Sequence, residues 1–216
     1  MKRCDFYIFD LDNTLLDSRK GYEEAFIAAF REFGMPYDPA LYNEYIRTPL
    51  RMTFSRYCPN SPGAYGDFLS VINDNYERTH LNGVRLFPDA ERCLDRLFEA
   101  GCGLGIVSNS YMKQMAEILV RLGVDGMFSS VVGRDRVVFS KPDPEPVLLC
   151  MSEMGAPPDR TMMIGDSVND ILAGKGAGLF SVLINRYGED IQCGECDAAI
   201  ESLDDLFISN LGMLRK

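Results

Sequence analysis

The sequence predicts an α/β fold, with a Rossmann-like parallel sheet in a three-layer α/β/α core and an inserted all-helical domain. From residue 84 onward, short apolar runs alternate with segments of helical spacing, which is typical of a parallel sheet covered by helices on both faces. Between residues 17 and 83 only helical spacing is found. A chain of 216 residues can hold one main core and a smaller second unit. We therefore expect an α/β core formed by residues 1–16 and 84–216, and a helical domain formed by residues 17–83.

The composition is that of an ordinary globular chain with few special partners. Hydrophobic residues make up 46% and charged residues 25%, and the formal net charge of −10 argues against non-specific binding to nucleic acid or anionic membranes. No apolar run has the length of a membrane span or a signal peptide. Seven cysteines, an odd number, indicate reduced thiols, so we expect a cytoplasmic protein. Cys193 and Cys196 form a lone CxxC pair, which we interpret as two thiols near a surface loop.

The first elements are a strand and then several helices. Residues 4–9 are almost wholly apolar and should form a strand buried on both faces. Asp17 and Ser18 then provide a helix cap, and the helical spacing that follows should end at Gly34. Two further helices are expected over residues 41–57 and 64–79, with a loop rich in proline between them.

The rest of the chain alternates between helix and strand. The predicted strands are 103–107, 128–132, 161–164 and 180–184. The predicted helices are 89–100, 112–122, 144–154, 169–174 and 203–209. This order gives a parallel sheet whose strands all end at one edge, where open α/β sheets bind their ligands.

Two carboxylates follow the first strand directly. Asp10 and Asp12 are two residues apart in an extended segment, so their side chains should point to the same side. Two unpaired acids repel each other and resist burial, which makes little structural sense unless they share a cation or a proton. This position predicts a metal site or a catalytic site, and Thr14 completes the cluster.

Three more polar clusters should lie at the same edge of the sheet. They are Ser108–Ser110, Lys141–Pro142 and Gly165–Asp170. The first and the last directly follow predicted strands, and the second opens a predicted helix. Taken singly, each also suits an ordinary turn, a helix cap or a solvated surface. Their common edge, however, favours one shared site.

The residue types in these clusters suit phosphoryl transfer. Mg²⁺ prefers hard oxygen ligands. Such ligands are offered by the carboxylates of Asp10 and Asp166 and by the backbone carbonyl of Asp12. Attack by the Asp10 carboxylate on a phosphoryl group brings like charges together, at a cost of roughly 4 kcal/mol per pair at about 4 Å and an effective dielectric of about 20. The divalent ion and the ammonium of Lys141 can offset that repulsion.

Other residues of the clusters have roles in the same reaction. Ser108, the backbone N–H of Asn109 and Thr14 can bind the phosphate oxygens. Asp12 can protonate the leaving oxygen and later deprotonate water. Asp170 lies four residues after Asp166 and suits a supporting role, orienting Lys141 or a metal-bound water.

The four clusters resemble the motifs of the haloacid dehalogenase superfamily. The helical insertion after the first strand is similar to the cap of its phosphoglycolate-phosphatase-like branch, and the similarity extends over essentially the whole chain, including residues 141–146 and the Ala177–Gly178 step. The resemblance implies a five-stranded core with the first strand central and a magnesium-dependent aspartyl-phosphate mechanism. It implies the same roles for the matching residues: Asp10 as nucleophile, Asp12 as acid and base, Ser108 and Lys141 as phosphate and charge binders, and Asp166 as metal ligand.

The sequence departs from this pattern at two positions. Asn13 and Asp89 stand where many relatives carry glycine. Asparagine tolerates a left-handed backbone, so we expect no loss at Asn13, and Asp89 should affect only a turn.

We expect a Mg²⁺-dependent phosphatase acting on a small phosphorylated metabolite, such as phosphoglycolate, a sugar phosphate, a nucleotide or pyrophosphate. A phosphomutase of the β-phosphoglucomutase type and a non-catalytic protein that binds a phosphorylated ligand are the alternatives. Dehalogenases and phosphonatases of the superfamily lack an acid at the position of Asp12, which makes those reactions unsuitable here. We expect no nucleic-acid or membrane partner, and a monomer or weak homodimer.

Substrate choice should lie in the helical insertion. Its tyrosines, at positions 22, 37, 42, 45, 57, 65 and 76, are expected mainly to form its core. Arg47 and Arg51 flank a bend and are either solvated charges or contacts to an anionic substrate, with Arg56 nearby. His80, the single histidine, is interpreted as a linker residue.

Overall fold

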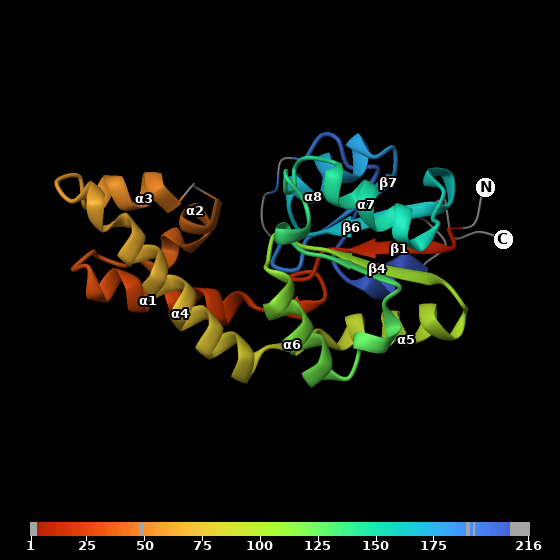
Figure 1. Ribbon diagram of the computed structural model, residues 1–216, viewed down its shortest axis with the longest axis horizontal. Coiled ribbons are helices and arrows are strands. Elements are labelled where there is room, and N and C mark those ends of the chain that lie inside the picture. Colours follow the sequence, from red (N-terminus) through yellow and green to blue (C-terminus); the bar gives the residue numbers. More distant parts are fainter. Residues whose placement is uncertain (1–3, 48–49, 189–190, 192, 208–216) are drawn as a thin grey trace. The chain divides into compact units, whose positions relative to one another are not determined.

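The computed structural model describes residues 4–47, 50–188, 191 and 193–207 (Figure 1). The chain divides into two compact units, one formed by Met1–Asp17 with Arg85–Lys216 and the other by Ser18–Val84. In the parts of the chain described, no helix combines the length and the apolar character needed to cross a membrane. The seven cysteines all lie in the described segments and none forms a disulfide.

The first unit is built on a six-stranded sheet in the order β5-β4-β1-β6-β7-β8, with every neighbouring pair parallel. The strands are β1 (Phe6–Phe9), β4 (Gly103–Val107), β5 (Ser130–Val132), β6 (Thr161–Gly165), β7 (Phe180–Ile184) and β8 (Ala198–Ile200). The first strand lies between β4 and β6, so the prediction that it is interior is confirmed. The expected sheet of five strands was one strand short, because β8 adds a sixth at the edge.

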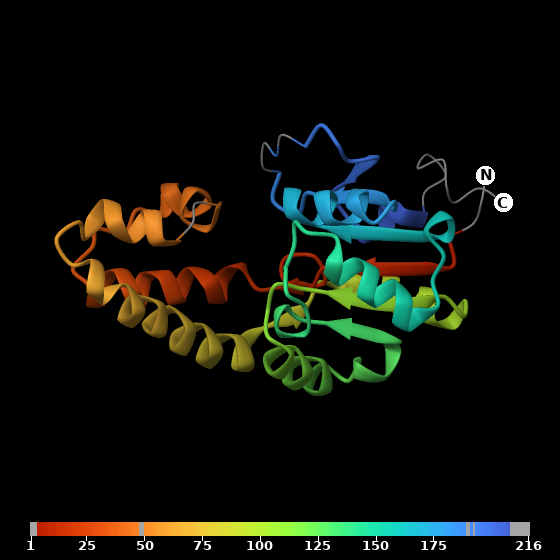
Figure 2. The same ribbon diagram turned by 45° about the horizontal axis from the view of Figure 1, so that its top comes forward.

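Helices cover both faces of this sheet, which confirms the three-layer α/β/α core (Figures 1 and 2). Helices α5 (Pro88–Glu99) and α6 (Met112–Leu122) lie on one face, and α7 (Glu145–Met154) and α8 (Val168–Gly176) lie on the other. Ile8 and Met163 of the sheet pack against Val147, Cys150 and Ala173 of the last two helices in one buried cluster. Apolar side chains on both faces of the central strands therefore hold the sheet between the two helical layers.

Short elements complete the unit. A second sheet pairs β2 (Leu16–Asp17) with β3 (Arg85–Leu86) in antiparallel fashion. Single 3₁₀ turns are found at Asp125–Met127, Arg134–Arg136, Pro158–Arg160 and Leu203–Phe207. The last of these stands where an α-helix over residues 203–209 was predicted, and residues 208–209 lie outside the described part of the chain.

The second unit is entirely helical in its described residues. It contains α1 (Arg19–Glu32), α2 (Tyr42–Arg47), α3 (Leu50–Tyr57) and α4 (Tyr65–Gly83), with 3₁₀ turns at Pro39–Leu41 and Pro62–Ala64. The helix predicted over residues 41–57 is described as α2 and α3, and residues 48–49 between them lie outside the described part. Ser18 is the N-cap residue of α1, as expected, although its side chain makes no capping hydrogen bond.

Aromatic side chains form the core of the second unit, as the spacing predicted. Its buried members include Phe26, Phe30, Tyr42, Tyr45, Phe54, Phe68 and Tyr76. The rings of Tyr22 and Tyr76 stack with centroids 3.9 Å apart. The guanidinium of Arg51 lies 5.3 Å from the ring centre of Tyr65, and that of Arg56 pairs with Glu44 at 2.5 Å. The side chains of Arg47 and His80 fall outside the described part of the structure.

Candidate active site

The centre of the site is the buried ammonium of Lys141. Its Nζ donates to Oδ1 of Asp10 at 2.6 Å, to Oδ1 of Asp170 at 2.5 Å and to the backbone carbonyl of Val107 at 2.8 Å. An ammonium carries three protons, so all of its donors are engaged. The Lys141 side chain is 3% exposed, and those of Asp10 and Asp170 are 9% and 1% exposed. Segments far apart in the sequence thus meet in one charged cluster at the carboxyl ends of the strands.

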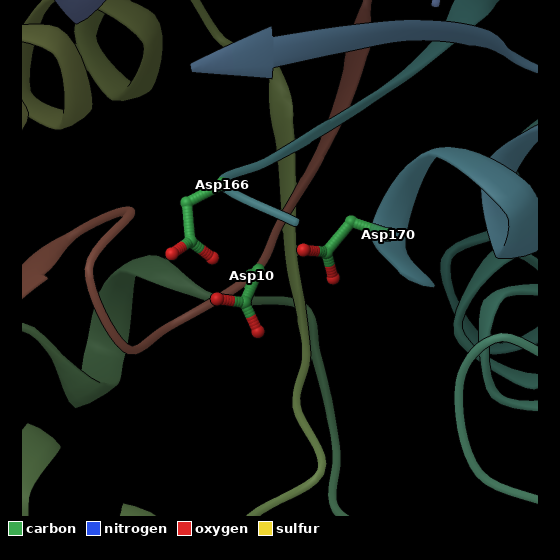
Figure 3. Close-up of side chains that lie close together, drawn as sticks. All are labelled: Asp10, Asp166 and Asp170. Carbon is green, nitrogen blue, oxygen red and sulfur yellow. The ribbon is translucent and has the colours of Figure 1, made fainter. Parts of the chain in front are cut away.

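A third carboxylate completes the cluster. Asp10 follows β1, Asp166 follows β6, and Asp170 lies in the first turn of α8. Figure 3 shows the three side chains pointing toward a common centre, and each offers an oxygen within 4.8 Å of the others. Oxygen donors without nitrogen or sulfur are the set that Mg²⁺ binds in proteins.

Burial and charge perturb the acids of this cluster. Burial raises the pKa of Asp10 to about 7, although Lys141 opposes the rise, and Asp170 adds to it. Burial and the charge of Asp10 likewise raise the pKa of Asp166 well above its usual range. Burial alone lowers the pKa of Lys141, but the carboxylates of Asp10 and Asp170 outweigh it and the net pKa is raised. Three acids therefore share one cation, and a divalent metal fits the charge that Lys141 leaves uncompensated.

Asp170 is fixed from two sides. Its Oδ1 accepts from Lys141, while its Oδ2 accepts from the backbone N–H of Ser167 at 3.0 Å and from the Ser167 hydroxyl at 2.5 Å. Ser167 in turn caps α8 through the N–H of Asp170, which forms a capping box. Ser167 was not among the predicted site residues, although serine followed three positions later by an acid is a recognisable capping signal.

The segment after β4 contacts both Asp12 and Lys141. The hydroxyl of Ser110 donates to Oδ2 of Asp12 at 3.0 Å, and Nδ2 of Asn109 donates to the backbone carbonyl of Lys141 at 3.2 Å. Ser108 is buried, and its Oγ accepts from the N–H of Ser110 at 3.1 Å. The predicted segment Ser108–Ser110 therefore lies beside the cluster, and the structure gives Ser110, to which the sequence assigned no role, a contact with Asp12.

The turn after β1 contains Asn13 and Thr14, for which the sequence made separate predictions. Asn13 has a φ of 57°, which is the left-handed backbone expected for an asparagine in place of glycine. Thr14 is fully buried, and its Oγ1 has no hydrogen-bond partner among the described residues. The predicted role of Thr14 in phosphate binding therefore stays a prediction.

Asp89 has a larger role than the turn expected for it. It is buried in the first turn of α5, and both of its carboxylate oxygens accept from Nη1 of Arg186, at 2.8 and 2.6 Å. Nothing in the local sequence pattern indicated this pair, because the partners are 97 positions apart.

Comparisons with known proteins identify the family of the chain. The profile of the haloacid dehalogenase-like hydrolases matches residues 7–184. Pyrophosphatase PpaX from Oceanobacillus iheyensis is 30% identical over 202 residues, which cover 92% of this chain and 93% of the relative. Phosphoglycolate phosphatase from Salmonella paratyphi A is 31% identical over 224 residues, covering 92% of this chain and 89% of the relative.

Solved structures share the fold at lower identity. A haloacid dehalogenase-like hydrolase from Streptococcus pneumoniae superposes with a TM-score of 0.79 at 21% identity, covering 94% of this chain and 97% of that structure. CbbY from Rhodobacter sphaeroides, solved in complex with phosphate, has a TM-score of 0.78 at 22% identity and covers 94% and 96%. The resemblance inferred from the four sequence clusters is thereby confirmed, and this chain belongs to the haloacid dehalogenase-like hydrolases.

Proposed function

We propose that the chain is a Mg²⁺-dependent phosphatase that hydrolyses a small phosphorylated metabolite through an aspartyl-phosphate on Asp10. The observation that carries the proposal is the Lys141 ammonium, buried between Asp10 and Asp170 with the carboxylate of Asp166 beside them. A cation fixed against two acids in a buried site is a costly way to stabilise a fold, and perturbed acids of this kind gather at catalytic sites.

The first step is attack of the Asp10 carboxylate on the phosphorus atom. Lys141 holds Oδ1 of Asp10, so we assign the attack to Oδ2. A bond forms between Oδ2 and phosphorus while the bond from phosphorus to the leaving oxygen breaks. Asp10, Asp166 and the backbone carbonyl of Asp12 would hold Mg²⁺, which would neutralise part of the phosphoryl charge.

Neighbouring residues handle the proton and the developing charge. Asp12, held by the Ser110 hydroxyl, donates a proton to the leaving oxygen. It then accepts a proton from the water that attacks the aspartyl-phosphate, which releases phosphate and restores the Asp10 carboxylate. Ser108 and the backbone N–H of Asn109 donate to the phosphoryl oxygens as their charge changes. Asp170 orients Lys141 and does not itself need to contact the metal.

The substrate class follows from the relatives. Those named pyrophosphatase and phosphoglycolate phosphatase are similar over nearly the full length of this chain, which supports a small anionic phosphate compound as the substrate. We assign the chemistry to the α/β unit, because every residue named above belongs to it, and substrate selection to the helical cap. A cytoplasmic location and a monomeric or weakly dimeric state stay predictions.

The Asp10→Asn variant tests the proposal. An amide is a far poorer nucleophile than a carboxylate, so we expect phosphate release to fall by about a thousandfold or more. The measurement is release of inorganic phosphate, with Mg²⁺, from a panel of phosphoglycolate, pyrophosphate, sugar phosphates and nucleoside monophosphates. Asp125→Asn makes the same chemical change at an exposed position and should leave turnover unchanged.

The same assay separates the alternatives. Retention of most activity by Asp10→Asn would refute the assignment of the nucleophile. Conversion of a hexose phosphate to its isomer without phosphate release would indicate a mutase. Binding of phosphorylated ligands with no turnover by the wild-type protein would indicate a non-catalytic role.

A further inference from the structure

The turn that carries Asp12 is a short loop that must be held in place from outside. Residues 11–16, here called the Asp12 turn, are closed by hydrogen bonds from the N–H of Leu16 to the carbonyl of Leu11 at 2.9 Å and from the N–H of Asn13 to the carbonyl of Leu16 at 2.7 Å. These bonds lie within the turn and fix its shape. The position of the turn relative to the rest of the α/β unit depends on contacts to other segments.

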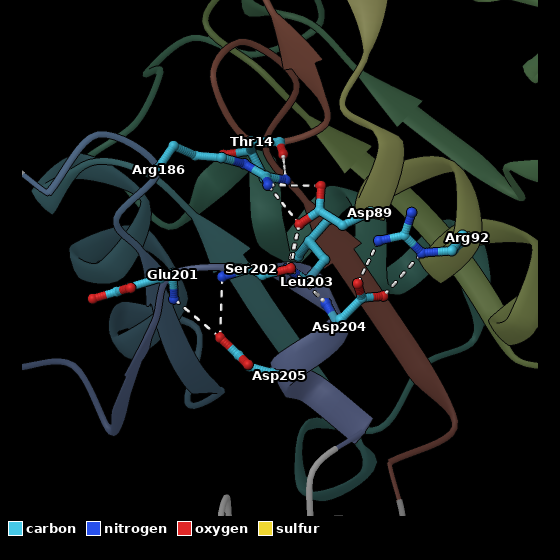
Figure 4. Close-up of polar contacts among 9 residues, drawn as sticks. All are labelled: Thr14, Asp89, Arg92, Arg186, Glu201, Ser202, Leu203, Asp204 and Asp205. Carbon is cyan, nitrogen blue, oxygen red and sulfur yellow. Dashed lines mark hydrogen bonds and ion pairs between the residues drawn. The ribbon is translucent and has the colours of Figure 1, made fainter.

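Arg186, which follows β7, provides one such contact. Its Nη2 donates to the backbone carbonyl of Thr14 at 2.6 Å, while its Nη1 donates to both carboxylate oxygens of Asp89 (Figure 4). The guanidinium also lies 4.0 Å from the ring centre of Phe87. One planar fork therefore joins the Asp12 turn to the start of α5, which a single ammonium could not do with the same geometry.

Asp89 is itself firmly held, so that Arg186 has a fixed support. Its Oδ2 accepts from the hydroxyl of Ser202 and from the N–H of Leu203, both at 2.7 Å. Burial opposes ionisation of Asp89, but the hydrogen bonds from Ser202 and Arg186 outweigh it and lower its pKa. The side chains of Arg186 and Asp89 are only 6% and 10% exposed. The ion pair is thus buried among three separate segments.

The next residue makes a second contact to the same region. The hydroxyl of Tyr187 lies 3.3 Å from Oδ1 of Asn13 and 3.3 Å from Oδ1 of Asp17, so its proton can be donated to either side chain. Two consecutive residues after β7 therefore contact three residues in and beside the Asp12 turn.

Stability alone does not explain the buried pair. A buried ion pair is often no more stabilising than apolar side chains of similar volume, because removing both charges from water is costly. Here the desolvation is not fully compensated, since Nε of Arg186 is buried with no hydrogen-bond partner in the described chain. What the pair gives is a defined position for the carbonyl of Thr14, two residues from Asp12.

We propose that Arg186 is a positioning residue for the proton transfer by Asp12: it holds the Asp12 turn where the carboxylate can reach the leaving oxygen. This inference rests on the proposed function. It predicts a selective defect, because a displaced general acid matters most when the leaving group is basic and needs the proton.

The experiment compares phenyl phosphate with 4-nitrophenyl phosphate, which has a similar shape and a much better leaving group. Arg186→Met keeps an apolar side chain over Phe87 and removes the donors, and we expect its kcat/KM for phenyl phosphate to fall about tenfold more than that for 4-nitrophenyl phosphate. Arg186→Lys keeps a charged donor, so its ratio of kcat/KM for the two substrates should lie between those of the wild type and Arg186→Met. Arg92→Met is the matched control, because it breaks the exposed pair with Asp204 without touching the turn (Figure 4).

The ratio of the two substrates separates positioning from simple loss of folded enzyme. If Arg186→Met lowers kcat/KM equally for both substrates, or lowers it for neither, the inference is overturned. If Arg186→Met does not fold, the ratio for Arg186→Lys decides in the same way.

A second measurement does not depend on activity. Amide hydrogen exchange of residues 11–16 should become at least about tenfold faster in Arg186→Met and stay unchanged in Arg92→Met. Unchanged exchange in Arg186→Met would also overturn the inference. If the wild-type protein shows no Asp10-dependent turnover, the proposed function fails, and hydrogen exchange alone then decides whether Arg186 anchors the turn.

Discussion

Lys141 is the single residue on which the charge balance of the site depends. It is the cation that contacts both Asp10 and Asp170, and all three of its protons are used. Removing one partner of a buried ion pair leaves the other charge without compensation, which costs far more than the pair contributes in net stability.

Lys141→Met should therefore lower the free energy of unfolding by about 3–5 kcal/mol in metal-free buffer. Adding Asp170→Asn to Lys141→Met removes one of the carboxylate charges left without a partner. The loss of unfolding free energy in the double variant should therefore be smaller than the sum of the losses in the two single variants. Denaturant unfolding of the four proteins measures this coupling. Lys175→Met, which breaks a half-exposed pair with Asp197, should cost less than about 1 kcal/mol. Strict additivity of Lys141→Met and Asp170→Asn would contradict the shared charge balance.

Functional residues could be predicted where their type and their place at the end of an element suit the chemistry, but their contacts could not be predicted. The acids and the lysine were recognisable because they stand at the ends of predicted strands and helices. Ser110 belonged to a predicted cluster and Asp89 was noted as a departure from the family pattern, but their contacts with Asp12 and Arg186, 98 and 97 positions away, could not be predicted. Contacts of that range are fixed by the topology of the sheet, which no local pattern contains.

At the scale of elements, the junction between β6 and α8 is packed without spare room. A Cβ atom added at Gly165 would lie 2.3 Å from both Cβ and Cγ of Asp170. Asp170 cannot move aside easily, because Lys141 and Ser167 hold its two oxygens. Glycine at the end of β6 thus allows α8 to begin close enough for Asp170 to reach the cluster.

Gly165→Ala should accordingly lower the free energy of unfolding by about 1–3 kcal/mol, as overpacking does, and should also lower phosphate release by displacing Asp170 from Lys141. Gly126→Ala is the control, since a Cβ there meets no atom within 4 Å. Thermal unfolding and the phosphatase assay together measure the effect. A Gly165→Ala protein as stable and active as the wild type would show that the junction has more freedom than the packing indicates.

Most elements followed from hydrophobic spacing, and the exceptions are short. The bounds of β4, α6 and β7 were predicted to the residue. β8 was missed because its three residues, Ala198–Ile200, are too short an apolar run to indicate a strand, and pairing with β7 defines it. β2 and β3 have two residues each, which is too short for any alternation to appear. Tertiary pairing, not local preference, creates these strands.

At the scale of the whole molecule, the acidic cluster links stability to pH and to metal. Without metal, burial raises the pKa of Asp10 to about 7 from an ordinary value of 3.8, and the pKa of Asp166 is also raised. Between these values the folded protein binds more protons than the unfolded chain. The protonated carboxyl groups of Asp10 and Asp166 therefore contribute to the free energy of unfolding at low pH, and this contribution is lost as the pH rises through their folded-state pKa values.

In chelator, the free energy of unfolding should fall between about pH 4 and about pH 7, by at most about 1.4 kcal/mol per pH unit for each proton. Added Mg²⁺ should restore stability, and more so at the higher pH, because it binds the deprotonated acids. Asp166→Asn should flatten the pH dependence and abolish most of the Mg²⁺ effect, while Asp125→Asn should change neither. Equal stabilisation of wild type and Asp166→Asn by Mg²⁺, followed by thermal unfolding, would place the ion elsewhere.

The antiparallel pairing of Leu16–Asp17 with Arg85–Leu86 has a consequence for how this chain can change over evolution. The polypeptide leaves the α/β unit and returns to it at paired backbone positions, so the helical insertion begins and ends at one place. Residues can be inserted, deleted or substituted in this insertion without shifting the register of any strand in the six-stranded sheet. The sequence of the helical insertion can therefore change during evolution independently of the residues of the candidate active site.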